Sequence, residues 1–157
     1  MKVAVLTVSD RSAAGERPDE GGPLVAAIVG RSGEVVATAV VPDEIAAIQQ
    51  ALCAWADAGT IDVIVTTGGT GFGPRDVTPE ATRAVIDRQA PGLAEAMRAA
   101  GMAKTPYAAL SRQVAGMRGN CLIVNVPGSL KAIREGLEAI VDVLPHAVEM
   151  MSGGTPP

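Results

Sequence analysis

Residues 62–71, Asp62-Val63-Ile64-Val65-Thr66-Thr67-Gly68-Gly69-Thr70-Gly71, join a continuous β-branched run to a segment rich in glycine. The first half is typical of a strand that is buried on both faces of a parallel sheet. Further along, Thr78-Pro79-Glu80 has the residues of a helix start, with Thr78 as N-cap and Pro79 at the first helical position. The segment therefore predicts a buried strand, a glycine turn and a helix in succession.

The same alternation extends in both directions along the chain. Runs of the same kind occur at residues 3–8, 35–41 and 121–126, and helical periodicity occurs at residues 22–30, 44–58, 78–89, 93–100 and 129–144. This pattern predicts an α/β fold of three layers, with a mostly parallel sheet covered by helices on both faces. We expect one domain over residues 1–151 and a flexible tail over residues 152–157. Residues 105–119 are hard to assign, apart from a hairpin turn at Gly119-Asn120.

The composition excludes several classes of protein. The formal net charge of −4 argues against sequence-independent nucleic-acid binding, which requires concentrated Lys and Arg. No stretch approaches the roughly 18 apolar residues of a membrane span, and the N-terminal apolar run is too short for a signal peptide. We therefore expect a cytoplasmic protein without membrane contact, in which Cys53 and Cys121 are buried free thiols.

The glycine-rich loop that follows residue 67 is the first candidate ligand site. It places four glycines within six residues, a composition that allows the backbone to approach a ligand and offer N–H groups to an anion. The threonine hydroxyls of Thr66, Thr67 and Thr70 are further potential donors. A P-loop is excluded because no Lys is present, and a dinucleotide fingerprint is excluded because Pro74 stands where it needs glycine. The loop therefore predicts a phosphate site of another type.

Three acidic residues are expected at the same edge of the sheet, because the carboxyl ends of parallel strands carry the ligand. Asp76 suits either a local turn residue or a Mg²⁺ ligand beside phosphate groups. Asp43 suits a helix N-cap as well as an acidic site at the end of the second strand. Asp10 ends the first strand, and the polar segment 11–22 after it is a candidate cover for the site.

A second glycine turn, Pro127-Gly128-Ser129, follows the strand at residues 121–126 and precedes a helix. Ser129 suits either a plain N-cap or part of a second anion site. The nearby cations Arg112, Arg118 and Lys131 are either solvated surface charges or phosphate ligands. The single histidine, His146, is expected to pack near the start of the last helical turn. The sequence has neither a Ser-His-Asp triad motif nor a zinc constellation.

Several ordered motifs resemble the molybdopterin adenylyltransferase family of the MogA/MoaB type, which includes the N-terminal domain of gephyrin. The resemblance spans about residues 3–151. The motifs are Val8-Ser9-Asp10, Val41-Pro42-Asp43-Glu44, Thr66-Thr67-Gly68-Gly69-Thr70-Gly71, Pro74-Arg75-Asp76-Val77-Thr78-Pro79-Glu80-Ala81-Thr82, Leu110-Ser111-Arg112 and Asn125-Val126-Pro127-Gly128-Ser129.

This resemblance implies a trimer that transfers AMP from Mg·ATP to the terminal phosphate of molybdopterin and releases pyrophosphate. It implies Asp43 and Asp76 as catalytic residues, and we expect both to hold Mg²⁺. It also implies hand-over of the product to a molybdate-insertion protein. The expected substrate-binding residues are Ser9, Asp10, Thr67, Gly68, Gly69, Thr70, Gly71, Arg75, Ser111, Arg112, Pro127, Gly128, Ser129 and Lys131.

The expected chemistry is consistent with these residues. A phosphate nucleophile is already ionised at neutral pH, so catalysis requires positioning and charge neutralisation rather than a strong base. Arg75 or Lys131 is the expected source of positive charge. Two alternatives stay open: a pterin-binding or scaffolding module without turnover, and a role in molybdate insertion. The two aspartates favour the enzyme, because a binder of an anion gains little from added carboxylates unless a metal intervenes.

Overall fold

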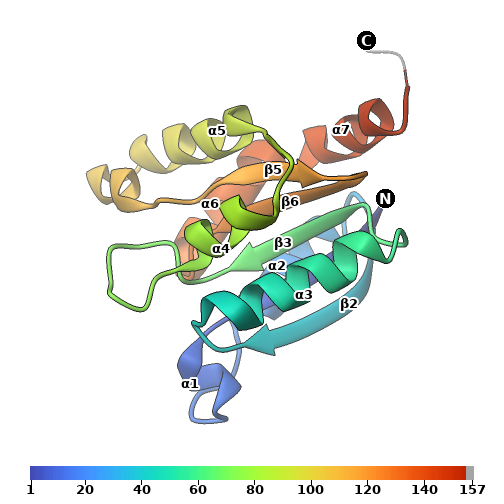
Figure 1. Ribbon diagram of the computed structural model, residues 1–157. Helices are drawn as coiled ribbons and strands as arrows, with labels where there is room; N and C mark the ends of the chain where they lie inside the picture. Colours follow the sequence, from blue (N-terminus) through green and yellow to red (C-terminus); the bar gives the residue numbers. More distant parts are fainter. Residues whose placement is uncertain (155–157) are drawn as a thin grey trace.

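A single six-stranded sheet runs through the centre of the molecule in the order β2-β1-β3-β6-β5-β4 (Figure 1). The computed structural model describes residues 1–154. Strands β2, β1, β3 and β6 are mutually parallel, whereas β5 and β4 are antiparallel additions at one edge. The strands are β1 (Lys2–Val8), β2 (Glu34–Val41), β3 (Val63–Thr67), β4 (Arg88–Gln89), β5 (Ala115–Arg118) and β6 (Cys121–Val126).

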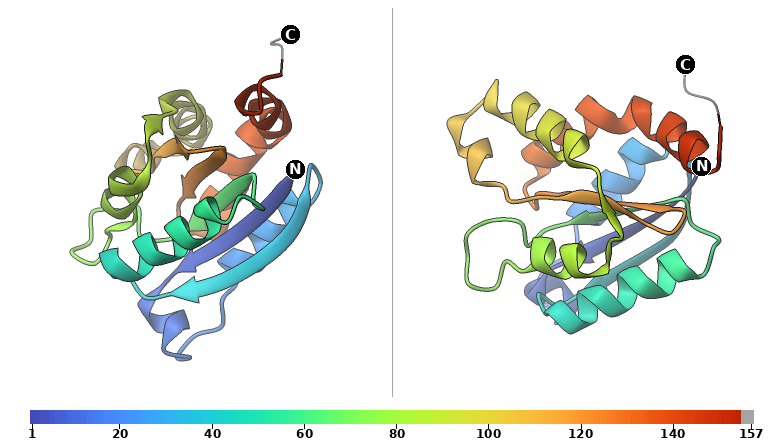
Figure 2. Two further views of the ribbon diagram at one scale, coloured as in Figure 1. Left: turned by 45° about the vertical axis from the view of Figure 1, so that its right-hand side comes forward. Right: turned by 45° about the horizontal axis from the view of Figure 1, so that its top comes forward.

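Helices cover both faces of this sheet (Figures 1 and 2). Helices α3 and α4 pack side by side on one face, and α2, α6 and α5 cover the other. The helices are α1 (Asp10–Ala13), α2 (Gly21–Val29), α3 (Ile45–Asp57), α4 (Thr78–Val85), α5 (Pro91–Met102), α6 (Leu130–Ile140) and α7 (Leu144–Met151), with 3-10 turns η1 (Pro106–Leu110) and η2 (Val141–Val143). None of the helices over residues 1–154 is long and apolar enough to cross a bilayer. The predicted three-layer α/β fold is confirmed.

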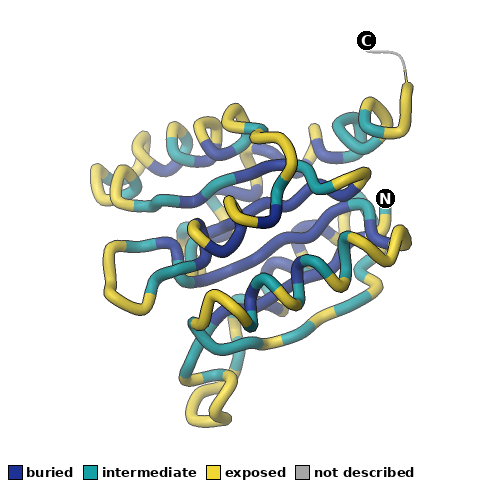
Figure 3. The backbone as a smooth tube through the Cα atoms, in the orientation of Figure 1, coloured by how far each residue is buried: buried dark blue, intermediate teal, exposed yellow. Residues whose placement is uncertain are grey.

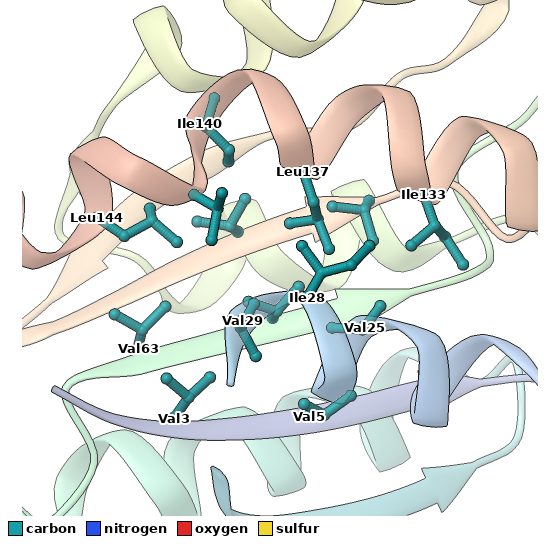
Figure 4. Packing of buried hydrophobic residues seen from close by; sticks show 14 of the residues in the cluster. Val3, Val5, Val25, Ile28, Val29, Val63, Ile133, Leu137, Ile140 and Leu144 are labelled. Atoms are coloured by element: carbon teal, nitrogen blue, oxygen red, sulfur yellow. The ribbon is translucent and has the colours of Figure 1, made fainter. Parts of the chain in front are cut away.

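The core consists of two apolar layers, one on each side of the sheet, and Figure 3 shows the central strands as its most buried part. Alternate residues of each strand enter opposite layers, since successive side chains of a strand point to opposite faces. Val3 and Val5 thus lie in one layer with Val29 of α2 and Leu137 of α6 (Figure 4), while Leu6 lies in the other layer. Branched aliphatic side chains therefore build both layers.

The structure corrects several local expectations. The run at residues 35–41 was expected to be buried on both faces, but β2 is an edge strand whose burial alternates, and Val36 and Val40 are exposed. The helix predicted to reach residue 89 ends at Val85, because Asp87 and Ala90 pair with the backbone of the β5 strand. The last helix is interrupted by η2.

Other local expectations hold. The hairpin through Gly119-Asn120 joins β5 to β6 as predicted. Both cysteines are free as predicted, and Cys121 is buried; the predicted burial of Cys53 is wrong, since it is only partly buried. His146 lies in the first turn of α7. Of the predicted tail, residues 155–157 lie outside the described part of the chain.

A buried polar network ties the sheet to the helix layer below the glycine turn. The side-chain amide of Asn125 donates to the hydroxyls of Thr66 (3.0 Å) and Thr82 (2.9 Å), and its oxygen accepts from the N–H of Val114 (3.3 Å). Asn125, Thr66 and Thr82 are fully buried. Since buried polar groups are costly when unpaired, this network fixes β3, β6 and α4 in one arrangement.

We expect Asn125→Ala to lower the free energy of unfolding by about 2–4 kcal/mol, because it leaves the N–H of Val114 unpaired and opens a cavity. Urea unfolding followed by circular dichroism measures this loss. The control is Asn120→Ala in the exposed hairpin turn, which should change stability by less than about 0.5 kcal/mol. Equal effects of the two substitutions would show that the network is not stabilising.

Candidate active site

The carboxyl ends of β1, β3 and β6 meet at one edge of the sheet, beside the loop at the left of Figure 1 that joins β3 to α4. Gly68 has φ +99°, and a Cβ there would overlap the carbonyl oxygen of Val8. Gly128 lies against the backbone of Gly68, since a Cβ added to Gly128 would lie 3.3 Å from the Cα of Gly68. The two glycine turns predicted from the sequence therefore pack backbone against backbone.

This packing leaves N–H groups open at the strand ends. Among residues 1–154, the N–H groups of Gly69, Thr70 and Gly71 have no hydrogen-bond partner, and neither do those of Gly128 and Ser129. The N–H of Gly68 is not open, because it donates to Val126 O. Successive free N–H groups beside a helix start form an anion-binding surface.

The threonine hydroxyls serve the fold rather than a ligand. Thr67 donates to Pro127 O at 2.9 Å and so links the two glycine turns. Thr66 accepts from Asn125 in the buried network, and Thr70 lies 3.3 Å from the hydroxyl of Ser111. Thr67 is therefore not a free side-chain donor, and Thr66 is fully buried and lines neither compartment of the site described below.

Two adjoining compartments form a cleft over these turns. The polar compartment has a volume of about 490 Å³ and lies over β1, β3 and the segment before α2. The apolar compartment has a volume of about 440 Å³ and lies between the glycine loop, α5, η1 and α6. Both are lined by Gly69, Asp76, Gly128 and Ser129. One ligand, or two reacting ligands, can thus extend across Asp76.

Asp43 belongs to the polar compartment, where it is paired with the backbone of Asp10. The N–H of Asp10 donates to Asp43 Oδ2 at 2.8 Å, and the N–H of Asp43 donates to Asp10 Oδ1 at 3.0 Å. Burial raises the pKa of Asp43, although the hydrogen bond from Asp10 opposes the shift; the charges of Asp10 and Asp76 raise it further. Asp43 does not cap α3, whose N-cap is Glu44.

Asp76 makes the local turn contact that was one of its two predicted roles. Its Oδ2 accepts from the N–H of Gly73 at 2.8 Å. Its Oδ1 makes no hydrogen bond within the described chain, and the same is true of Asp43 Oδ1. Each carboxylate therefore keeps one oxygen available at the cleft. In this respect the turn role and a ligand role are compatible.

The cations predicted to bind phosphate make other contacts in the structure. Arg75 donates to both carboxylate oxygens of Asp10, at 2.9 and 3.0 Å, and this pair holds the pKa of Asp10 below its usual value. Arg112 donates to the backbone oxygens of Gly71 and Asp76 and pairs with Glu80. Arg75, Arg112, Asp10 and Lys131 line neither compartment.

The remaining predicted site residues come together around the cleft. Ser129 also caps α6, since its hydroxyl accepts from the N–H of Ala132 at 3.2 Å. Thr78, expected as an N-cap, instead is the first residue of α4 and donates to Gly68 O at 2.9 Å. The predicted residues that line the two compartments are Ser9, Asp43, Thr67, Gly68, Gly69, Thr70, Gly71, Asp76, Ser111, Pro127, Gly128 and Ser129.

Sequence reasoning missed several residues of the polar compartment, among them Arg17 and Asp19. Arg17 is exposed and forms no salt bridge within residues 1–154. Asp19 accepts from Thr7 Oγ1 at 2.7 Å and from the N–H of Gly22 at 2.9 Å, and so ties the segment before α2 to β1. The segment 11–22 was predicted as a cover, but nothing in its pattern distinguished these two residues.

The apolar compartment also contains residues that the sequence did not indicate. Met97 and Arg98 come from α5, and Tyr107 from η1. Tyr107 is 77% exposed, so its ring lies at the mouth of the compartment. An apolar cavity with an aromatic ring at its mouth suits a flat heterocycle.

Comparison with known proteins agrees with this geometry. Residues 4–146 match the family model described as "Probable molybdopterin binding domain". The chain belongs to this family. The family resemblance predicted from the sequence motifs is thereby confirmed.

Relatives within the family differ in length. The molybdopterin adenylyltransferase of Escherichia coli (strain K12) is 36% identical, over 98% of this chain and 86% of its own. Cinnamon, a molybdenum cofactor synthesis protein of Drosophila melanogaster, is 44% identical over 94% of this chain, which spans 25% of cinnamon's length. Among solved structures, the molybdopterin biosynthesis enzyme MoaB of Thermus thermophilus superimposes with a TM-score of 0.91 and is 52% identical, covering 97% of this chain and 96% of its own.

The backbone contact of Gly68 gives a direct test of the site's construction. We expect Gly68→Ala to cost at least about 2 kcal/mol of stability, because the new Cβ overlaps Val8 O and the positive φ is strained for alanine. Thermal unfolding measures the loss. Gly92→Ala is the control: Gly92 lies in α5 with no atom near its Cβ position, so alanine should be neutral or stabilising there. A Gly68→Ala protein as stable as wild type would contradict the contact.

Proposed function

We propose that this protein transfers the adenylyl group of ATP to the terminal phosphate of molybdopterin, with release of pyrophosphate, in molybdenum cofactor biosynthesis. The observation that carries the proposal is the cleft itself: a polar and an apolar compartment join at Asp76, with a second carboxylate, Asp43, in the polar one. The likeness to adenylyltransferases along nearly the full chain supports the same reaction.

The two compartments suit different parts of the substrates. Phosphate groups fit the polar compartment, where open N–H groups follow Gly68 and Arg17 adds positive charge. A flat ring system fits the apolar compartment beside Met97 and Tyr107. The reacting phosphates of the two substrates would then meet near Asp76, which both compartments share.

The acidic residues fit a magnesium ion. Four acidic residues line the polar compartment: Asp19, Glu20, Asp43 and Asp76. Of these, Asp43 and Asp76 lie against the glycine loop, and each keeps one oxygen free of hydrogen bonds within the described chain. Magnesium is usually held by one or two carboxylates together with substrate phosphates and water, so Asp43 and Asp76 would be its protein ligands. When bound, Mg²⁺ neutralises charge on the triphosphate. Burial and the charges of Asp10 and Asp76 raise the pKa of Asp43, and a cation bound beside it would oppose this shift.

The bond changes require little acid–base chemistry from the protein. A terminal phosphate oxygen of molybdopterin forms a bond to the α-phosphorus of ATP, and the bond from that phosphorus to the β-phosphate bridging oxygen breaks. The oxygen nucleophile is anionic at neutral pH, and pyrophosphate leaves as an anion. The protein's contribution is therefore to position two anions and reduce their repulsion through backbone N–H groups and Arg17.

Replacement of the carboxylates tests this assignment. We expect Asp76→Asn and Asp43→Asn each to lower turnover by at least about 100-fold, because each removes negative charge needed for the metal while keeping the side-chain shape. Purified protein is mixed with molybdopterin, ATP and Mg²⁺, and adenylylated molybdopterin is detected by mass spectrometry. Circular dichroism should show folded variants.

The outcomes separate the candidate functions. Turnover by wild type and not by the variants supports the proposal. Unchanged turnover in Asp76→Asn contradicts the role of that residue. If wild type binds molybdopterin but forms no product, the chain is a binding or scaffolding module; dependence on molybdate rather than ATP indicates insertion chemistry. The homotrimer, the cytoplasmic location and the hand-over partner stay predictions from the sequence.

Arg17 is expected to neutralise phosphate charge, a role the sequence had suggested for Arg75 or Lys131. Arg17→Gln should lower kcat/KM for ATP about tenfold or more, because it removes a charge-assisted contact. Arg11→Gln is the matched control, since Arg11 is also exposed in the same segment but lines neither compartment. Steady-state kinetics at fixed ionic strength measures both. Equal losses of kcat/KM in the two variants would mean that Arg17 acts only through the general positive potential of its segment.

A further inference from the structure

A third cavity lies between α4 and α5, behind the segment 111–115 that leads into β5. Its volume is about 390 Å³. Three arginines line it and no carboxylate does, in a chain whose formal net charge is −4. The lining residues are Arg83, Gln89, Pro91, Ala94, Arg98, Ala109, Ser111, Arg112, Gln113, Val114 and Ala115.

Two of the three guanidinium groups keep donors for a ligand. Arg98 donates through Nη1 to the backbone oxygens of Ser111 (3.2 Å) and Gln113 (3.0 Å), while its Nε and Nη2 have no partner in the described chain. Arg83 forms no salt bridge within residues 1–154. By contrast, Arg112 is fully engaged by Glu80 and by two backbone oxygens of the glycine loop.

Gln113 adds a neutral hydrogen-bond donor beside the arginines. Its side chain is 3% exposed, and one end of its amide contacts the hydroxyl of Ser111. The amide nitrogen has no hydrogen-bond partner within residues 1–154, although it belongs to a residue that lines the cavity. This nitrogen offers a further donor to a ligand that accepts a hydrogen bond.

We propose that this cavity is a second anion site beside the apolar compartment of the cleft, and that it binds the phosphate group of a small molecule through Arg83, Arg98 and Gln113. The two spaces share Arg98, Ser111 and Gln113, whereas Arg83 lines this cavity alone. Two guanidinium groups that keep open donors match the double charge of a phosphate monoester, whereas a carboxylate would need only one. The site contains none of the glycine-loop residues and neither Asp43 nor Asp76. Phosphate binding at Arg83, which lines neither compartment of the cleft, can therefore be tested separately from the proposed adenylyl transfer.

Titration of the ¹⁵N-labelled full chain with inorganic phosphate, at fixed ionic strength, tests the proposal. Amide signals of Ala109 and Val114 report on the cavity, and those of Gly69 and Gly128 report separately on the cleft. We expect saturable shifts at Ala109 and Val114. Arg83→Gln should weaken this binding about tenfold, as expected for the loss of a charged hydrogen bond, and leave the titration at Gly69 unchanged.

Arg88→Gln is the matched control, because Arg88 is also exposed, on β4, and does not line the cavity. It should leave phosphate binding at Ala109 and Val114 unchanged. Gln113→Leu should weaken the same titration while retaining the volume of the side chain. The proposal is overturned if these amides show no saturable shift, or if Arg83→Gln and Arg88→Gln weaken binding equally, which would mean general electrostatic attraction.

Discussion

The site depends on a contact between backbones. Gly68 lies against the carbonyl oxygen of Val8, and Gly128 lies against Gly68, so the ends of β1, β3 and β6 approach more closely than side chains would allow. This approach is possible because both turns lack a Cβ at the contact. Its consequence is a cleft floor made of peptide groups, whose free N–H groups face an anion without the entropic cost of ordering long side chains.

The carboxylates beside these free N–H groups need a separate explanation. Asp43 and Asp76 both line the polar compartment, and the negative charge of Asp76 disfavours ionisation of Asp43. The reciprocal hydrogen bonds between Asp10 and Asp43 keep one oxygen of Asp43 in place, and Arg75 balances Asp10 rather than the cleft. The arrangement leaves the cleft short of positive charge. That deficit is consistent with a cation that arrives with the substrate.

Much of the fold was predictable because its signals are local. The buried run at residues 63–67 and the glycines after it specify a strand and a turn by themselves, and the parallel topology follows from their alternation with helices. The strand β4 was not predictable, since residues 88–89 continue a helical pattern and only pairing with β5 makes them extended. Tertiary hydrogen bonds there outweigh a weak local preference.

The residues of the candidate site also divide into those that the sequence predicted and those that it did not. Residues on the glycine turns were found, because so many glycines in one short turn are costly unless the backbone must approach another group closely. Arg17 and Gln113 were not found: each is an ordinary polar residue in sequence, and its position depends on segments distant along the chain. Arg75 shows the opposite error, since it stands next to Asp76 in the motif but is held by Asp10, 65 residues away. Side-chain direction, unlike turn composition, is decided by long-range partners.

Arg112 shows how a motif residue can serve a site without touching a ligand. Its guanidinium holds Gly71 O and Asp76 O, and its own N–H donates to Thr70 O at 2.8 Å. These bonds fix both ends of the loop that carries Asp76, while the ion pair with Glu80 fixes the guanidinium itself. A lysine could not replace it, because a single ammonium cannot reach two carbonyls and a carboxylate in this planar arrangement. The position of Asp76 between the two compartments therefore depends on a cation outside both.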